Sequence, residues 1–478
     1  MARCWRGTRV VAAACVAGLL AAGCTSAATA TGVAGPATTG HTTVAAAPPG
    51  TAATGATSSQ ADWPTYDRTA GRSGVSVSSP APGKVRQSWR AAVDGAVYAQ
   101  PLVVGTQVII ATENNTVYAL NESTGAPRWK HHLATPVTGG LPCGNINPSG
   151  ITGTPVADVA AGTLWVVTFT SSPAYRHTLW ELSLSTGRTI SHRPVDAPGS
   201  DPRAEQERGA LALLGTRVYV PFGGLYGDCS DYKGRVVGAP VSGSGPLVIY
   251  TTPNQRQAGI WAPAGEAVRD GSLYVTTGNG QPYNQIDDSD SVLRLGPGLA
   301  VLSRFTPSDW ESLSANDQDL GSTGPALLPG GLVFQVGKQG VGYVLNGAKL
   351  GGTGKPLASA RVCEGGFGGD AVDGSTVVFS CYNSLHALQV TPGASGAAPR
   401  MHARWAVTGI SPGPPIIAGG VVWDVGRNGT VTGYRLSDGK RVFAAATAAV
   451  DSDFPSLSAS GTRLIVPEGH TVVSFLGI

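Results

Sequence analysis

The sequence predicts an all-β protein, an eight-bladed β-propeller of four-stranded antiparallel blades, with seven blades as the alternative. Only 13% of the 478 residues are charged, and 67 Gly and 34 Pro supply many turns. This composition excludes coiled-coil, disordered and helical classes. Apolar strand pairs recur roughly every 40 to 60 residues, and four short strands at a period of about 52 residues fit one propeller blade.

The first element, residues 1–23, is predicted to be a lipoprotein signal peptide. Three arginines precede an apolar stretch from Val10 to Ala22, which is shorter than the roughly 20 residues of a membrane span. The stretch ends in Leu20-Ala-Ala-Gly-Cys24, which resembles a bacterial lipobox, and Cys24 would then carry the lipid. Plain secretion is the alternative. We therefore expect an extracytoplasmic protein held at the cell membrane by its lipid anchor alone.

Residues 24–61 form the second element, a predicted flexible tether. Ala, Thr, Gly, Ser and Pro dominate it, and such a composition buries too little apolar surface to offset chain entropy. The folded domain is expected over residues 62–478, with Trp63 and Tyr66 anchoring its start. Without the signal peptide the charges nearly balance, so nucleic acid is not an expected partner.

The folded domain contains four cysteines, Cys143, Cys229, Cys363 and Cys381. An even number in an exported protein favours disulfides, and four cysteines allow three pairings. We expect Cys363 to pair with Cys381, about one strand pair away, and Cys143 to pair with Cys229, since each lies in a Gly-rich loop. A zinc site is the alternative, although no Cys-x-x-Cys motif occurs.

A repeated unit organises the folded domain. Its copies begin at Asn115, Trp180 and Tyr434, and in each an alternating strand leads to a Gly turn and then a second strand. Upstream apolar strand pairs are expected at Pro101–Thr112, Pro155–Thr168, Leu211–Phe222, Ala264–Thr276, Pro325–Val336, Ala371–Cys381, Pro415–Val425 and Pro455–Val466. The last blade lacks an outer strand, which Lys84–Ala92 is predicted to supply, closing the ring. Residues 291–310 and 341–362 are hard to assign to blades, which keeps seven blades as the alternative.

The unit Tyr118-Ala-Leu-Asn-x-x-x-Thr-Gly-x-x-x-Trp129 resembles the pyrroloquinoline quinone (PQQ) repeat, whose tryptophans dock neighbouring blades. That superfamily includes quinoprotein alcohol dehydrogenases and also propellers without a quinone, such as the lipoprotein scaffold of outer-membrane barrel assembly. The resemblance covers nearly all of residues 63–478. It implies the fold, whereas a blade motif alone does not determine chemistry.

The resemblance also implies site residues. Trp261 would form the floor under PQQ, and Asn279, in Thr277-Gly-Asn-Gly280, would bind Ca²⁺. Asp319 would act as the catalytic base, and Lys338 would contact the quinone. The structural alternatives are a blade-docking aromatic for Trp261, a turn with positive φ for Asn279, a solvated loop for Asp319 and a surface cation for Lys338.

Two features depart from the dehydrogenase pattern. The family's adjacent cysteine pair is reduced to a lone Cys143, and its Glu calcium ligand is replaced in the corresponding region by Asp228 as a stand-in. We therefore expect a binding or scaffolding protein that uses its loop face, with a protein partner. The alternative is a PQQ- and Ca²⁺-dependent dehydrogenase acting on a small alcohol or sugar. A closed ring leaves no free sheet edge, so a monomer is expected.

Overall fold

A computed structural model describes residues 59–478, except residues 394–396, 449 and 451. The predicted signal peptide, the lipidation site Cys24 and most of the tether lie outside the described residues, so they stay predictions. Within the described part, none of the helices has the length and apolar character needed to cross a membrane.

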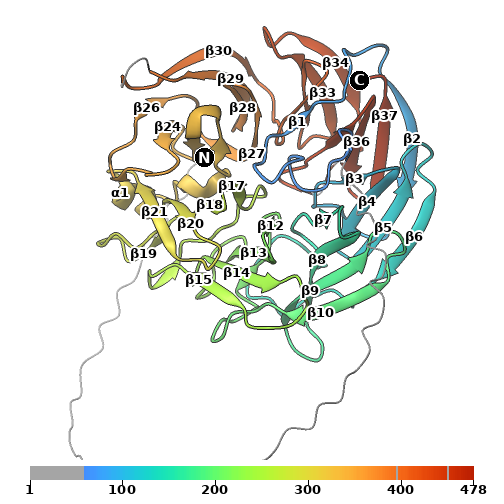
Figure 1. Ribbon diagram of the computed structural model, residues 1–478, viewed down its shortest axis with the longest axis horizontal. Helices are drawn as coiled ribbons and strands as arrows, with labels where there is room; N and C mark the ends of the chain where they lie inside the picture. Colours follow the sequence, from blue (N-terminus) through green and yellow to red (C-terminus); the bar gives the residue numbers. More distant parts are fainter. Residues whose placement is uncertain (1–58, 394–396, 449, 451) are drawn as a thin grey trace, which may run out of the picture. The chain divides into compact units, whose positions relative to one another are not determined.

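Eight antiparallel sheets are arranged around a common axis, and four strands of each sheet form one blade of the propeller (Figure 1). The first four blades are β3 (Leu102–Val104), β4 (Gln107–Thr112), β5 (Thr116–Asn121) and β6 (Pro127–His132); β7 (Val156–Asp158), β8 (Thr163–Thr170), β9 (Arg176–Ser183) and β10 (Thr189–Pro194); β12 (Ala212–Leu214), β13 (Arg217–Gly224), β14 (Arg235–Pro240) and β15 (Val248–Thr251); and β17 (Ala267–Arg269), β18 (Ser272–Thr276), β20 (Val292–Leu295) and β21 (Val301–Thr306). The predicted eight-bladed propeller is thus confirmed.

The other four blades are β22 (Ala326–Leu327), β23 (Leu332–Val336), β24 (Val341–Asn346) and β26 (Ala358–Arg361); β27 (Gly366–Asp373), β28 (Thr376–Cys381), β29 (Ser384–Thr391) and β30 (Arg400–Thr408); β31 (Ile416–Ala418), β32 (Val421–Val425), β33 (Thr430–Arg435) and β34 (Arg441–Ala446); and β35 (Ser458–Ser460), β36 (Arg463–Glu468), β37 (Thr471–Leu476) and β2 (Arg86–Ala92). The short elements are β1 (Val75–Ser76), β11 (Glu205–Gln206), β16 (Arg256–Gln257), β19 (Gly280–Gln281), β25 (Gly352–Thr353), the helix α1 (Trp310–Ala315) and the 3₁₀ turns η1 (Leu320–Ser322) and η2 (Pro329–Gly331).

The ring closes as the sequence predicts. Strand β2, near the start of the domain, pairs antiparallel with β37 at the chain's end and completes the eighth blade. Closure by the two ends of the chain removes the sheet edge that an open blade would expose.

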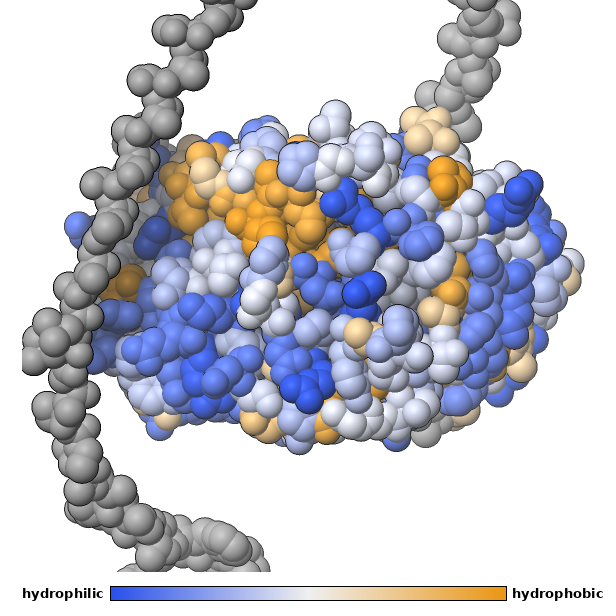
Figure 2. Space-filling view, turned by 90° about the horizontal axis from the view of Figure 1, so that it is seen from below, coloured by the Kyte–Doolittle hydropathy of each residue, from blue (hydrophilic) through white to orange (hydrophobic). Residues whose placement is uncertain are grey.

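Burial decreases from the middle of each blade outward. Strands β4 and β5 are almost entirely buried, whereas the outer strands β6, β10 and β34 contain no buried residue. Figure 2 shows one side of the ring, where hydrophilic and intermediate residues predominate around one large hydrophobic area and several smaller ones. The apolar core therefore lies between neighbouring blades.

Tryptophans dock one blade on the next, as the repeat predicts. The indole N–H of Trp129 donates to the carbonyl of Leu184 at 3.1 Å, and its ring lies against Gly187, which has a φ of +69°. Trp89 packs in the same way on Gly125 in the turn between β5 and β6, and Trp405 on Gly439. A Cβ on any of these glycines would collide with the indole, so the turn glycine provides both the positive φ and the space for the ring.

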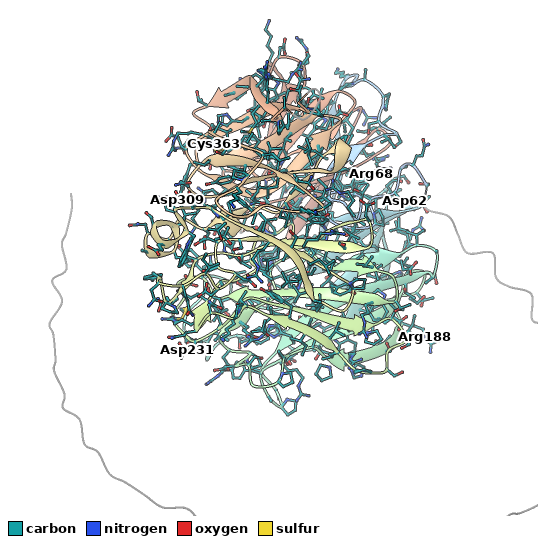
Figure 3. All side chains as sticks on the ribbon, turned by 60° about the vertical axis from the view of Figure 1, so that its left-hand side comes forward. Asp62, Arg68, Arg188, Asp231, Asp309 and Cys363 are labelled. Carbon is teal, nitrogen blue, oxygen red and sulfur yellow. A yellow bond between two sulfur atoms is a disulfide. The ribbon has the colours of Figure 1, made fainter. Side chains whose placement is uncertain are left out.

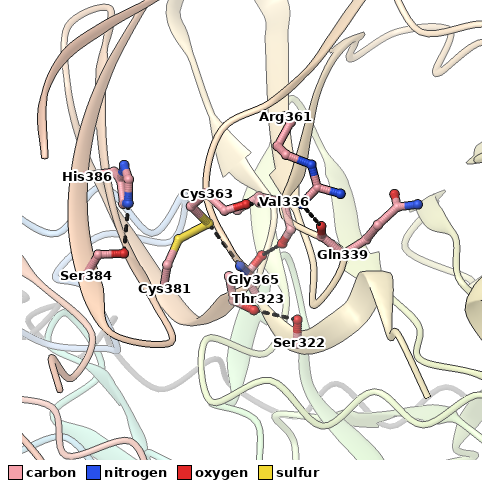
Figure 4. The surroundings of a disulfide bond; sticks show 11 residues. Ser322, Thr323, Val336, Gln339, Arg361, Cys363, Gly365, Cys381, Ser384 and His386 are labelled. Carbon is pink, nitrogen blue, oxygen red and sulfur yellow. Dashed lines mark hydrogen bonds between the residues drawn. A yellow bond between two sulfur atoms is a disulfide. The ribbon is translucent and has the colours of Figure 1, made fainter. Parts of the chain in front are cut away.

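Both predicted disulfides are present, Cys143–Cys229 and Cys363–Cys381, with Cα–Cα distances of 6.1 and 6.4 Å. In the second, the N–H of Gly365 donates to the sulfur of Cys363 at 3.3 Å (Figure 4). The zinc alternative is wrong for these four cysteines, because their sulfurs are bonded to each other.

Residues 62–76, which we call the N-terminal segment, run around one end of the axis. Five innermost strands each donate a backbone N–H to its carbonyls, through Val103, Ala157, Val268, Val372 and Ile417, at 2.7 to 3.0 Å. The segment therefore satisfies donors that the inner edges of these blades would otherwise leave unpaired. Figure 3 shows Asp62 and Arg68 on the opposite side of the ring from Asp231, Asp309 and Cys363.

Charged groups of the N-terminal segment are buried on the axis. The Arg72 guanidinium donates to the carbonyls of Glu266 and Leu211 at 2.8 and 3.0 Å. Burial raises the pKa of Asp67 to about 8, and burial likewise raises the pKa of Glu266 to about 8. Both carboxyls therefore keep a proton in the folded protein at pH values at which an unfolded chain has released it.

The free energy of unfolding should accordingly fall as pH rises from about 4 to about 8. In that window the folded state binds more protons than the unfolded state, which gives stability a negative slope against pH. We expect a higher melting temperature at pH 5 than at pH 8.5, and a shallower decline in Glu266→Gln. Thermal unfolding monitored by circular dichroism across this range measures both, and a wild-type melting temperature that rises with pH contradicts the assignment.

Candidate functional site

A pocket of about 620 Å³ lies at one end of the axis of the ring. It is lined mainly by the loops that precede the first strand of a blade and by those that follow its second strand. All five residues predicted for cofactor, metal or catalysis line it: Asp228, Trp261, Asn279, Asp319 and Lys338. They come from the loops of three consecutive blades, following β13, preceding β17, following β18, preceding β22 and following β23. The volume lies within the range usual for small-molecule sites.

Lys338 and Asp319 form the charged centre of the pocket. The Lys338 ammonium lies 2.5 Å from Oδ2 of Asp319 and 2.8 Å from Oδ1 of Asp317. Asp319 is 2% exposed and Lys338 has a side-chain exposure of 18%. The solvated-loop and surface-cation alternatives are therefore wrong for these two residues.

The second oxygen of Asp319 is also fixed, because the backbone N–H of Asn279 donates to Oδ1 at 2.6 Å. Burial raises the pKa of the Asp319 carboxyl, and the Lys338 ammonium partly offsets this effect. Burial lowers the pKa of Lys338, but Asp319 and Asp317 raise it further, so Lys338 keeps its charge. The pocket thus holds the positive charge of Lys338 beside the Asp319 carboxyl, whose pKa lies above the range usual for an aspartate.

Trp261 forms part of the wall next to this pair. The Lys338 ammonium lies 5.6 Å from the centre of the indole, within cation–π range. A side chain at position 278 would collide with the Asp319 carboxylate and would approach the indole nitrogen of Trp261 to 3.1 Å, so the glycine of Thr277-Gly-Asn is required here. Trp261 precedes β17 and lines the pocket, whereas the docking tryptophans lie on outer strands, so the docking alternative is wrong.

Asn279 is buried, with its side chain at the pocket. Its φ is not among the positive values of the described residues, so the turn alternative is wrong. Within the described chain its carboxamide has no hydrogen-bond partner, while its main-chain carbonyl accepts from Ala258. The free carboxamide is therefore available to a ligand.

The oxygen donors do not form a complete calcium site. Oδ1 of Asp228 accepts from the Tyr232 hydroxyl at 2.6 Å, and both oxygens of Asp319 are engaged. Across the described residues, no group of three or more His, Cys, Asp or Glu side chains is arranged to hold a metal ion. Because Ca²⁺ takes 6 to 8 oxygen ligands, the protein groups present do not fit Ca²⁺ by themselves.

A second carboxyl supports the Asp319 loop from behind. Asp290 accepts from the backbone N–H of Leu320 at 2.9 Å and from the Ser314 hydroxyl at 2.6 Å. Burial, and then the neighbouring Asp319, raise the pKa of Asp290 to about 8. Asp290 therefore contributes to holding Asp319 in position without adding a second negative charge near neutral pH.

Sequence reasoning missed an aromatic and cationic group in the pocket. The Phe454 ring lies 6.1 Å from Trp261 and 6.4 Å from Phe367, measured between ring centres. Arg208 lies over Phe454 and over Tyr98, with its guanidinium carbon 5.6 and 5.8 Å from the ring centres. The four missed residues, Tyr98, Arg208, Phe367 and Phe454, come from four different blades, and no motif in the sequence connects them.

Comparison with known proteins gives two kinds of relative. Residues 51–287 match the family described as outer membrane protein assembly factor BamB. Polyvinylalcohol dehydrogenase of Sphingopyxis sp. (strain 113P3) is 24% identical over 243 residues, which cover 44% of this chain and 34% of the enzyme. The match therefore spans about a third of the length of that enzyme.

Solved structures show the same division. A quinohemoprotein alcohol dehydrogenase from Comamonas testosteroni superposes with a TM-score of 0.63 and 16% identity, covering 87% of this chain and 80% of that one. BamB from Moraxella catarrhalis superposes with a TM-score of 0.55 and 13% identity, covering 82% of this chain and 98% of that one. At such identities the likeness shows the fold alone.

Proposed function

The chain is a β-propeller of the PQQ-repeat superfamily, and from this premise we propose that its axial pocket binds a planar quinone such as PQQ and oxidises an alcohol or sugar. The observation that carries the proposal is the meeting of Trp261, Asn279, Asp319 and Lys338 in one pocket. These residues are separated by up to 77 positions in the sequence. We place the activity outside the cytoplasm, as the predicted export signal and the two disulfides favour.

Each residue has a chemical role in this proposal. The indole of Trp261 offers a flat apolar face on which a planar ring system stacks. Lys338 supplies positive charge near the stacking face. Asp319, once its carboxyl is ionised, accepts the hydroxyl proton of the substrate. A bound quinone would supply the two-electron acceptor that no side chain of the protein offers. We derive no role for Ca²⁺, since the oxygen donors do not complete its site.

Binding of the quinone is tested by titrating the purified full chain with PQQ, with and without added Ca²⁺, and following tryptophan fluorescence. We expect saturable quenching, and Trp261→Ala should weaken binding at least about 10-fold because the stacking face is lost. Trp180→Phe is the matched control, since Trp180 lies half-buried on β9, away from the pocket.

Turnover is then measured as reduction of an artificial dye in the presence of alcohols and sugars. No saturable quenching of the wild type at any PQQ concentration would contradict the proposal. A melting temperature for Trp261→Ala equal to that of the wild type ensures that lost binding reflects the pocket.

A second candidate is binding without turnover. It is favoured by the engagement of both Asp319 oxygens, one by Lys338 and the other by the backbone of Asn279. A carboxylate held in this way is less free to accept a proton. Quenching by PQQ without dye reduction by any substrate would support this candidate and would make the pocket a binding site alone.

A further inference from the structure

Arg208 is a buried cation that faces the pocket without a carboxylate partner. It is 8% exposed and lines the pocket. Nη2 donates a hydrogen bond to the Ser452 hydroxyl at 3.3 Å, and no carboxylate of the described residues lies within ion-pair distance of the guanidinium. Burying a guanidinium without a carboxylate partner is costly.

The other cations of the pocket are already paired. Lys338 contacts Asp319 and Asp317, and Arg427 lies 3.6 Å from Asp453. Arg208 differs from both because its neighbours are the rings of Tyr98 and Phe454. Aromatic rings orient the guanidinium without satisfying its N–H donors, so these donors remain available for a ligand.

The carboxyls behind Arg208 are bound elsewhere. Oε2 of Glu113 accepts from the backbone of Gly150 at 2.6 Å, and Oε2 of Glu207 accepts from Gly153 at 3.2 Å. Burial raises the pKa of Glu113 to about 7, and burial also raises the pKa of Glu207. Near neutral pH Glu113 is therefore only partly ionised, so these carboxyls neutralise Arg208 only in part.

We propose that Arg208 binds a carboxylate of the pocket's ligand. A guanidinium recognises a carboxylate through two parallel N–H donors. Phe454 is a neighbour of both Arg208 and Trp261, at 5.6 Å from the guanidinium carbon and 6.1 Å from the indole, so a ligand stacked on Trp261 can reach Arg208. The carboxylate has two sources, the quinone itself or an acidic substrate such as a sugar acid. The inference rests on the proposed function for the first source and is independent of it for the second.

The test compares Arg208→Gln with the wild type in two arms, both read by fluorescence binding. The first arm titrates PQQ, and the second titrates galacturonate against galactose, its neutral analogue, without PQQ. We expect Arg208→Gln to weaken binding of at least one carboxylate probe about 10-fold or more. Loss in the first arm identifies the quinone as the source, and loss in the second identifies the substrate.

Controls separate this site from general effects. Arg427→Gln removes a cation of the same pocket that is already paired with Asp453 and should change affinity much less. If its melting temperature shows that Arg208→Gln alters the fold, Arg208→Lys takes its place. This variant keeps the positive charge and should keep part of the affinity. Equal losses in Arg427→Gln, or unchanged affinity for both acidic probes, overturn the inference. Galacturonate binding without PQQ binding would refute the proposed function and leave the role of Arg208 intact.

Discussion

Asp319→Asn is expected to lower quinone-dependent dye reduction at least about 100-fold while leaving PQQ affinity within a few-fold of the wild type. General bases contribute roughly 10²- to 10⁴-fold to turnover. Asparagine retains an acceptor for the Asn279 N–H, which Oδ1 of Asp319 binds at 2.6 Å, but it cannot accept the substrate's proton. Steady-state kinetics and PQQ titration of the same preparation measure the two effects.

Asp317→Asn is the matched control for this prediction. Asp317 contacts the same ammonium of Lys338 at 2.8 Å, but its side chain is 69% exposed and it lies on the rim of the pocket. Its replacement should change turnover only a few-fold. Equal losses in the two variants would show that Lys338 needs its carboxylate partners, and would contradict a specific base at Asp319.

The pH dependence of turnover provides a second readout for Asp319. Burial raises its pKa, and a base must be ionised to act. Turnover should therefore fall as pH decreases through a pKa above the ordinary value of about 4. If turnover instead fell only around the ordinary aspartate pKa of about 4, a solvent-exposed carboxylate would control the rate.

The sequence predicted the architecture because a propeller repeats its local signals. The turn glycines and docking tryptophans recur with the blades, as for Gly187 and Trp129, and each reports a contact between neighbours in the chain. Blades four and five were hard to assign. Residues 291–310 hold β20 and β21, and residues 341–362 hold β24 and β26 with the short β25 between them, which pairs with the preceding blade.

The pocket was predicted only in part, and the reason is geometric. Trp261, Asn279, Asp319 and Lys338 lie in order along neighbouring blades, and the resemblance to the quinoprotein dehydrogenases, which follows that order, implied them. Arg208 and Phe454 meet across the axis, 246 positions apart. In the sequence, Glu207-Arg208 is an ordinary charged pair and Phe454 is an ordinary loop aromatic. Only closure of the ring brings these two side chains together.

Trp63→Ala is expected to reduce the free energy of unfolding by about 3 to 5 kcal/mol, the range for truncating a buried large aromatic. Trp63 is fully buried, and its indole N–H donates to Oε1 of Gln100 at 2.9 Å. The same Gln100 donates to the carbonyl of Leu457 in the eighth blade at 2.9 Å. The variant thus removes core volume and disturbs a link between the N-terminal segment and the first and last blades.

The comparison that tests the role of the N-terminal segment is Trp63→Ala against Trp129→Ala. Trp129 is half-buried on an outer strand and joins only two neighbouring blades, so its loss should cost less. Trp63→Phe keeps most of the ring and loses the hydrogen bond to Gln100, which should cost about 1 kcal/mol. Denaturant unfolding ranks the three variants. If Trp63→Ala were no more destabilising than Trp129→Ala, the N-terminal segment would be peripheral to the ring. The expected order would instead mean that two features hold the propeller ring closed. These are the pairing of β2 with β37 at the rim and the N-terminal segment on the axis.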